Sequence, residues 1–268
     1  LSSAASDVYK RQDPEAVVLG EVWEDAVIKS SYGYRRKYAL GESLDSVMNY
    51  PFRSAVIDFL CFRTDARALA SFLLGQRLNY PAPMYWSLMN LLSSHDVERV
   101  RTALATRLDA RSLSREQQAG FIVGDAQDIR GASMQKLAAA IQFTLPGVPC
   151  VYYGDEIAMQ GYRDPFNRAF FDWNSTEQRL RGPIKTLAAL RRSCDAFDGG
   201  RLEIVRAEGD ILHYRRVGVV QTAEIILNRG PHLIAEEAFG KNTEVNPGGF
   251  TVLVEDNHPE HVGYFSVY

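Results

Sequence analysis

Short apolar runs, each closed by polar residues, constrain the fold of this chain more than any other feature. Four of them cover residues 17–23, 47–50, 85–92 and 148–153. The segments between them carry apolar residues at helical spacing, as at Met134, Leu137, Ala138, Ile141 and Leu145. Buried parallel strands read as continuous apolar runs, and strands that alternate with helices favour a parallel sheet. The sequence therefore predicts an α/β domain with parallel strands.

The pattern changes after residue 198. Short apolar or alternating runs at 202–205, 211–214, 223–227 and 250–254 follow, separated by Gly-containing turn signals around residues 209 and 248. Runs of this length with turns between them are typical of antiparallel strands. We predict a small all-β domain over residues 199–268, after an α/β domain over residues 13–198.

Composition excludes several classes of protein. A net charge of −3 argues against nucleic acid, which binds basic surfaces, and no apolar run approaches the roughly 20 residues that span a bilayer. Cys61, Cys150 and Cys194 are odd in number and far apart, which favours reduced thiols and a cytoplasmic protein. Residues 1–12 lack the basic and apolar regions of a secretory signal and differ from the rest, so we expect a non-native leader there.

Carboxylates follow three of the four apolar runs: Glu21, Asp96, and the pair Asp155 and Glu156. The carboxyl ends of parallel strands meet at one edge of a sheet, so we expect these groups to lie near one another. Convergent charges are costly without a ligand, a cation or a proton, so they indicate a site. Two chemistries suit them: a cation held by the carboxylates and His95, or acid/base hydrolysis of a sugar, which needs one protonated carboxyl and one that stabilises charge.

Glu21 has a specific setting, because Trp23 follows it two residues later. An apolar wall formed by Trp23 would raise the pKa of the Glu21 carboxyl by desolvation and suit it to donate a proton. The alternative is an ordinary strand followed by a solvated acidic loop. A triad of Ser94, His95 and Asp96 is not expected, because neighbours on an extended segment point to opposite faces.

Five sequence segments carry the strongest functional signal. In chain order they are Gly20-Glu21-Val22-Trp23, Asp45 to Phe52, Asn90 to Arg99, Pro146 to Glu156, and Asp164-Pro165-Phe166-Asn167-Arg168 with Trp173. Together they resemble motifs of the α-amylase superfamily of glycoside hydrolases, and the segment 45–52 is most similar to the neopullulanase, cyclomaltodextrinase and maltogenic amylase branch. Several motifs in the same order over nearly the whole chain make this resemblance specific.

The resemblance implies the C-terminal half of a (β/α)8 TIM barrel, strands five to eight, followed by a small antiparallel β-sandwich domain. It also implies retaining hydrolysis of α-glucosidic bonds in maltooligosaccharides, cyclodextrins or pullulan, with transglycosylation as an additional activity. We expect no cofactor, no metal ligand, and no nucleic-acid or membrane partner in this chain. The calcium sites of the superfamily, and the N-terminal module through which many relatives form homodimers, would lie outside it.

Site roles are carried over residue by residue. The resemblance makes Glu21 the general acid/base and Asp96 the carboxylate that grips sugar hydroxyls most tightly in the transition state. His95 would bind the same sugar. Asp164 and Arg168 would border the subsites toward the non-reducing end. Trp23 would either stack on a sugar or pack at the edge of the barrel.

One part of the family pattern is missing. The retaining mechanism needs a second carboxylate about 5–5.5 Å from the acid, and the superfamily carries it in a Gly-x-Arg-x-Asp segment that precedes the acid. Asp13 and Glu15 precede Glu21, but their surroundings do not resemble that segment. We therefore expect an N-terminally truncated copy of an enzyme, inactive by itself. The alternative is a noncatalytic barrel relative that binds carbohydrate or serves as an assembly subunit. It is less favoured, because such a protein has no need of both Glu21 and Asp96.

Overall fold

Parallel strand pairs form the framework of the first part of the chain in a computed structural model, which describes residues 3–41, 43–108, 112–177, 179–257 and 265–267. β1 (Leu19–Gly20) pairs with β4 (Ser46–Val47), and β5 (Met89–Leu91) pairs with β6 (Val148–Cys150). A parallel bridge between Met48 and Met89 joins the two pairs. These strands therefore lie side by side in chain order, which confirms the predicted parallel arrangement.

The strands are shorter than the apolar runs that predicted them. Residues 85–87, expected to begin a strand, belong instead to helix α4 (Ala82–Ser87), where Met84 and Tyr85 are buried. A short apolar run suits a buried helix as well as a buried strand, so periodicity does not separate the two. Of the run 17–23 only β1 pairs, with Val17 exposed, and the run 148–153 leaves the sheet after Cys150.

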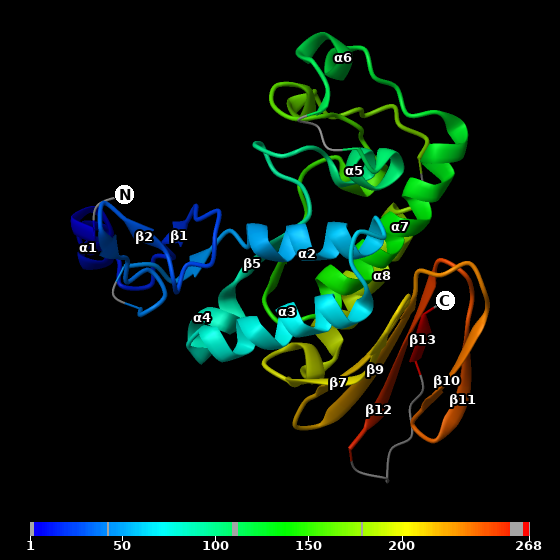
Figure 1. Cartoon of the computed structure of the whole chain (residues 1–268). Coiled ribbons are helices and arrows are strands. Elements are labelled where there is room, and N and C mark those ends of the chain that lie inside the picture. Colours follow the sequence, from blue (N-terminus) through cyan, green and yellow to red (C-terminus); the bar gives the residue numbers. More distant parts are fainter. Residues whose placement is uncertain (1–2, 42, 109–111, 178, 258–264, 268) are drawn as a thin grey trace.

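Helices and a short hairpin lie before, between and after these strands (Figure 1). They are α1 (Ser3–Gln12), the hairpin β2 (Ser30–Ser31) and β3 (Tyr34–Arg35), α2 (Tyr50–Leu60), α3 (Ala66–Asn79), α5 (Val100–Thr106), α6 (Arg115–Ala119), α7 (Asp125–Thr144) and α8 (Arg181–Ser193), with short 3₁₀ turns η2 (Asp155–Ile157), η3 (Phe166–Arg168) and η4 (Asp195–Phe197). Asn49 caps α2 by accepting from Phe52 N, and Ser114 with Gln117 forms a capping box on α6. Across the described ranges, no helix is both long enough and apolar enough to cross a membrane.

An antiparallel sheet follows the α/β part. Its order is β13 (Phe265–Val267), β12 (Gly249–Asp256), β9 (Gln221–Asn228), β8 (Ile211–Val217) and β7 (Arg201–Glu208), and a separate hairpin joins β10 (Ile234–Ala238) to β11 (Lys241–Val245). The predicted runs lie within β7, β8, β9 and β12. Gly209 and Gly248 occupy the predicted turns with φ of +53° and +61°, a conformation that glycine adopts without strain.

One hydrophobic core runs through both parts of the chain. The largest cluster of buried side chains includes Phe59 of α2, Ile141 of α7 and Ile225 of β9. Burial of each such side chain contributes about 1.5–3 kcal/mol. Figure 1 shows α7 beside the C-terminal sheet, so this helix packs between the parallel strands and that sheet.

Buried amide side chains link the parallel strands to one another. Asn49 Nδ2 donates to Asn90 Oδ1 at 2.8 Å, and Gln76 Nε2 donates to Asn49 Oδ1 at 2.9 Å. Gln142 Nε2 donates to the carbonyl oxygens of Asn90 and Cys150 at 3.0 and 2.9 Å. Because buried amides are costly when they lack partners, this network fixes the relative positions of β4, β5 and β6.

Candidate active site

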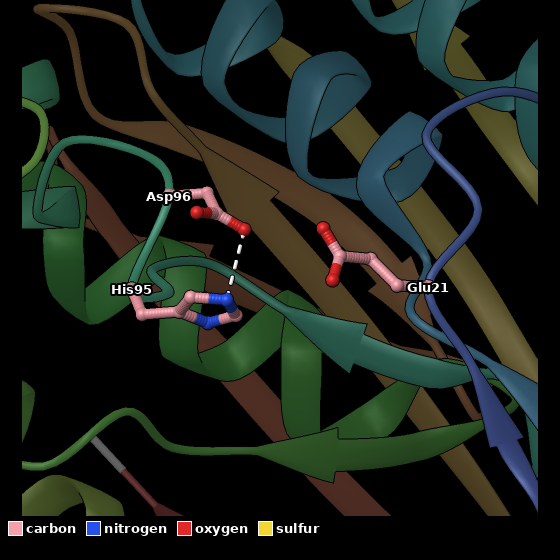
Figure 2. A group of neighbouring side chains, drawn as sticks. All are labelled: Glu21, His95 and Asp96. Atoms are coloured by element: carbon pink, nitrogen blue, oxygen red, sulfur yellow. Dashed lines mark ion pairs between the residues drawn. The ribbon is translucent and has the colours of Figure 1, made fainter.

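Glu21, His95 and Asp96 lie together beyond the carboxyl ends of β1 and β5 (Figure 2). One donor atom of each residue lies within 4.8 Å of the others. His95 Nε2 is 2.9 Å from Asp96 Oδ2, and the Glu21 carboxylate points toward this pair from the end of β1. The convergence predicted for Glu21 and Asp96 is therefore present. These donors suit sugar hydroxyls and a cation alike, so the geometry alone keeps both chemistries open.

Glu21 follows directly after β1. Met48 N donates to Gly20 O at 2.9 Å and fixes this strand end against β4. A Cβ on Gly20 would lie 2.4 Å from Leu44 Cδ1, so a larger residue would displace the buried Leu44. The Glu21 side chain itself is exposed. The apolar wall expected to desolvate Glu21 is therefore absent, and that part of the prediction is wrong.

Trp23 contacts Glu21 through its polar edge rather than through its apolar face. The indole Nε1 donates to Glu21 Oε1 at 3.1 Å. The indole ring stacks on Tyr50 with ring centroids 4.0 Å apart and planes 7° apart, while 43% of Trp23 stays exposed. Trp23 therefore packs at the edge of the sheet and still presents accessible ring surface.

Hydrogen bonds fix the loop that carries His95 and Asp96. Ser94 Oγ accepts from Asp96 N at 3.1 Å. Asn167 is fully buried, and its Nδ2 donates to the carbonyl oxygens of Ser94 and Val97 at 2.9 and 2.7 Å. The sequence analysis missed Asn167 as a support of the site. Its presence inside a recognised motif was the only signal that could have found it.

Arg168 joins the predicted non-reducing-end pair to this loop. Its Nε lies 2.8 Å from Asp164 Oδ1 and donates to His95 O at 3.0 Å. Its Nη2 lies 3.7 Å from Asp96 Oδ1. These side chains are partly exposed, so the ion pairs orient the residues more than they stabilise the fold. Every predicted site residue therefore belongs to one connected region.

The acidic pair at residues 155–156, expected at the same edge, is not part of this cluster. Asp155 is buried, with Oδ1 3.5 Å from Nη1 of the fully buried Arg99. Arg99 Nη1 donates to Tyr153 O at 2.6 Å, and the guanidinium lies over the rings of Tyr152 and Tyr153. Burial raises the pKa of Asp155 to about 7, although a hydrogen bond from Ser93 and the charge of Arg99 oppose the rise. Asp155 therefore supports the loops instead of lining the site, and Arg99 was missed as its partner.

Comparison with known proteins places this geometry in a family. Residues 2–195 match the family described as "Alpha amylase, catalytic domain". The amylopullulanase of Thermoanaerobacter thermohydrosulfuricus is 34% identical over 214 residues, which are 76% of this chain and 13% of that protein. The cyclomaltodextrinase of Bacillus sp. is 32% identical over 226 residues, which are 82% of this chain and 35% of that protein. The chain thus spans about a third or less of the length of these curated relatives.

Solved structures give the same result for the fold. The ligand-free cyclic alpha-maltosyl-(1→6)-maltose hydrolase from Arthrobacter globiformis superposes with a TM-score of 0.77 at 26% identity, over 95% of this chain and 52% of that one. This likeness supports an α-amylase-family fold with a β-rich C-terminal domain. Because the family match extends over well more than half of its length, the chain belongs to the alpha-amylase family of glycoside hydrolases.

Proposed function

We propose that this chain is the acid/base half of a retaining α-glycosidase that acts on α-glucosidic bonds in maltooligosaccharides, cyclodextrins or pullulan, with transglycosylation as a second activity. The observation that carries the proposal is the meeting of Glu21, His95 and Asp96 within 4.8 Å in a chain of the alpha-amylase family. The relatives named cyclomaltodextrinase and amylopullulanase support this class of substrate.

Glu21 has the role of proton donor. It protonates the glycosidic oxygen as the bond to the sugar breaks, and it later takes a proton from the attacking water, because one carboxyl serves both steps of a retaining mechanism. Its exposed side chain is accessible to a glucan, and the indole N–H of Trp23 orients it through Oε1.

Asp96 and His95 bind hydroxyl groups of the sugar whose bond breaks. Positive charge develops on the sugar ring in the oxocarbenium-like transition state, so a fixed carboxylate stabilises that state more than it stabilises the substrate. The hydrogen bond from Asp96 N to Ser94 Oγ keeps Asp96 in place. Asp164 and Arg168 hold the next sugar toward the non-reducing end.

We assign β1, β4, β5 and β6 to strands five to eight of a (β/α)8 barrel and the strands from β7 onward to a β-sandwich domain, with domain limits of 13–198 and 199–268. The parallel order of the first set, with helices between β4 and β5 and between β5 and β6, supports the barrel assignment. Contact of Ile226 on β9 with Ala238 and Val245 of the β10–β11 hairpin supports the sandwich.

We also propose that this chain does not hydrolyse glucans by itself, because no nucleophile-bearing Gly-x-Arg-x-Asp segment precedes Glu21 in its sequence. Asp13 and Glu15 are exposed, and Asp13 Oδ1 accepts from Glu15 N at 2.9 Å. The proposed proton transfer uses side chains alone and calls for no cofactor. A cytoplasmic location and assembly as a homodimer complete the proposal.

A chimera tests the function directly. This chain replaces the segment that it matches in the Bacillus sp. cyclomaltodextrinase, whose remaining part supplies the rest of the enzyme, and release of reducing sugar from β-cyclodextrin and maltotetraose is measured. We expect turnover by the chimera and none by the chain alone. Glu21→Gln in the chimera should lower kcat by about 10²–10⁴-fold, the usual contribution of a general acid.

The exposed Asp172→Asn serves as the matched control and should leave kcat unchanged. An active Glu21→Gln chimera would remove Glu21 from the acid role. Hydrolysis by the purified chain alone would overturn the argument from the missing nucleophile.

A further inference from the structure

The Tyr50 side chain contacts two parts of the site, which we call the Glu21 arm (Glu21 with Trp23) and the Asp96 arm (the loop from Ser94 to Asp96). Tyr50 follows β4, which pairs with β1 on one side and is bridged to β5 on the other. It is also the first residue of α2, whose N-terminus is capped by Asn49, so its backbone is fixed. Tyr50 itself is 3% exposed. A buried, fixed residue just beyond the middle strand is well placed to link the ends of the two neighbouring strands.

The Tyr50 ring faces the Glu21 arm. It stacks on Trp23 with ring centroids 4.0 Å apart and planes nearly parallel. Offset or parallel aromatic pairs of this kind add stabilisation beyond the area that they bury. Because Trp23 Nε1 donates to Glu21 Oε1 at 3.1 Å, the position of the Tyr50 ring determines where that donor lies.

The Tyr50 hydroxyl faces the Asp96 arm. It lies 3.2 Å from Ser94 Oγ, and the same Ser94 oxygen accepts from Asp96 N at 3.1 Å. Burial raises the pKa of the Tyr50 hydroxyl, and the charges of Asp96 and Glu21 raise it further, while the Ser94 hydrogen bond lowers it. The hydroxyl therefore stays protonated at neutral pH and can form its hydrogen bond with Ser94.

We infer that Tyr50 is a positioning residue that couples Glu21 to Asp96, through its stack on Trp23 and its hydrogen bond to Ser94. The inference rests on the proposed function of the two carboxylates. Packing alone would need only an aromatic ring at this position, because Tyr50 also packs with Leu91 and Val97. The hydroxyl is therefore the feature that separates coupling from packing.

Carboxyl-carbon NMR of the chain, labelled with ¹³C at Glu and Asp carboxyls, reads the two arms separately. Glu21→Gln and Asp96→Asn assign the two signals. Tyr50→Phe keeps the stack and removes the hydroxyl, so it should shift the carboxyl signal of Asp96 and leave that of Glu21 in place. Tyr50→Leu removes both links and should shift both signals. Ser94→Ala also removes the hydrogen bond from Asp96 N, so it should shift the Asp96 signal further than Tyr50→Phe does.

Tyr214→Phe is the matched control. It also removes a buried tyrosine hydroxyl, one bonded to Thr144 at the base of the C-terminal sheet, and should move neither signal. The coupling is wrong if Tyr50→Phe leaves Asp96 unchanged, or if a folded Tyr50→Leu leaves Glu21 unchanged. If Tyr50→Leu does not fold, Tyr50→Phe decides, because it deletes only the hydrogen bond to Ser94 Oγ.

Maltotetraose added to the unsubstituted chain separates this inference from the proposed function. Signals that respond to the Tyr50 variants but not to the sugar would uphold the coupling and contradict the glycosidase proposal. Signals that respond to the sugar but not to Tyr50→Phe would do the reverse.

Discussion

Glu21 and Asp96 face each other across the site, yet the first extends from an exposed strand end and the second stands on a loop with buried supports. The Glu21 side chain is held by the indole N–H of Trp23. The loop of Asp96 is held by Ser94, by the fully buried Asn167 and, further along, by the buried Arg99. The difference suits the two roles that we propose for these carboxylates. A proton donor changes charge and must reach its substrate, whereas a carboxylate that stabilises developing charge works best when it is fixed beforehand.

The largest effect is expected on the Asp96 arm, whose loop has buried supports. Arg99→Leu removes a cation that is fully buried and leaves Asp155 and the Tyr153 carbonyl without it. Breaking one partner of a buried pair costs about 3–5 kcal/mol. Chemical denaturation should show this loss in the free energy of unfolding. A loss of less than 1 kcal/mol in the free energy of unfolding would mean that Arg99 does not support the Asp96 arm. The contrast between the two arms would then fail.

Asp155 gives a pH-dependent test of the same arm. Its pKa is about 7 in the folded chain and ordinarily near 3.8, so the fold binds this proton more tightly than the unfolded chain does. The free energy of unfolding should therefore fall as pH rises from about 4 to about 7, by up to about 4 kcal/mol. Unfolding measured at several pH values should lose this slope in Asp155→Asn. The conservatively placed surface change Asp172→Asn should keep it, and a slope that survives Asp155→Asn would assign the proton elsewhere.

The smallest effect is expected on the Glu21 arm, which is exposed. Trp23→Phe keeps an aromatic ring for the stack on Tyr50 and removes one exposed hydrogen bond to Glu21. Changes at exposed positions usually stay within about 0.5 kcal/mol of zero. Thermal unfolding should be nearly unchanged. A destabilisation as large as that of Arg99→Leu would show that both arms are equally supported.

The fold was predictable where a pattern was long or locally complete. The runs in β7, β8, β9 and β12 and the glycine turns between them appeared in the sequence because an antiparallel hairpin is set by neighbouring residues. The parallel strands were predicted in type but not in length. They are two or three residues long and are held by Asn49, Asn90 and Gln142, whose partners are remote in sequence.

The sequence predicted that carboxylates meet at strand ends, but it did not predict the residues that hold them in place. Glu21 and Asp96 meet as expected. Asp155 has the same position relative to its strand and is nevertheless turned inward, because Arg99 provides a buried partner. Nothing in the local sequence distinguishes Asp155, which turns inward, from the carboxylates that meet at the site. The roles of Tyr50 and Asn167 were not predictable either, because both residues act through contacts with residues far away in the sequence.

Helix α7 carries a consequence for how the molecule comes apart. Its Gln142 binds the backbone of β5 and β6, while its Ser133 and Thr144 bind Gly248 and Tyr214 of the C-terminal sheet. The strand ends at the candidate site and the C-terminal sheet therefore share one helix, and we expect them to unfold in one transition. Removal of the sheet to obtain a smaller protein should expose α7 and destabilise the candidate site as well.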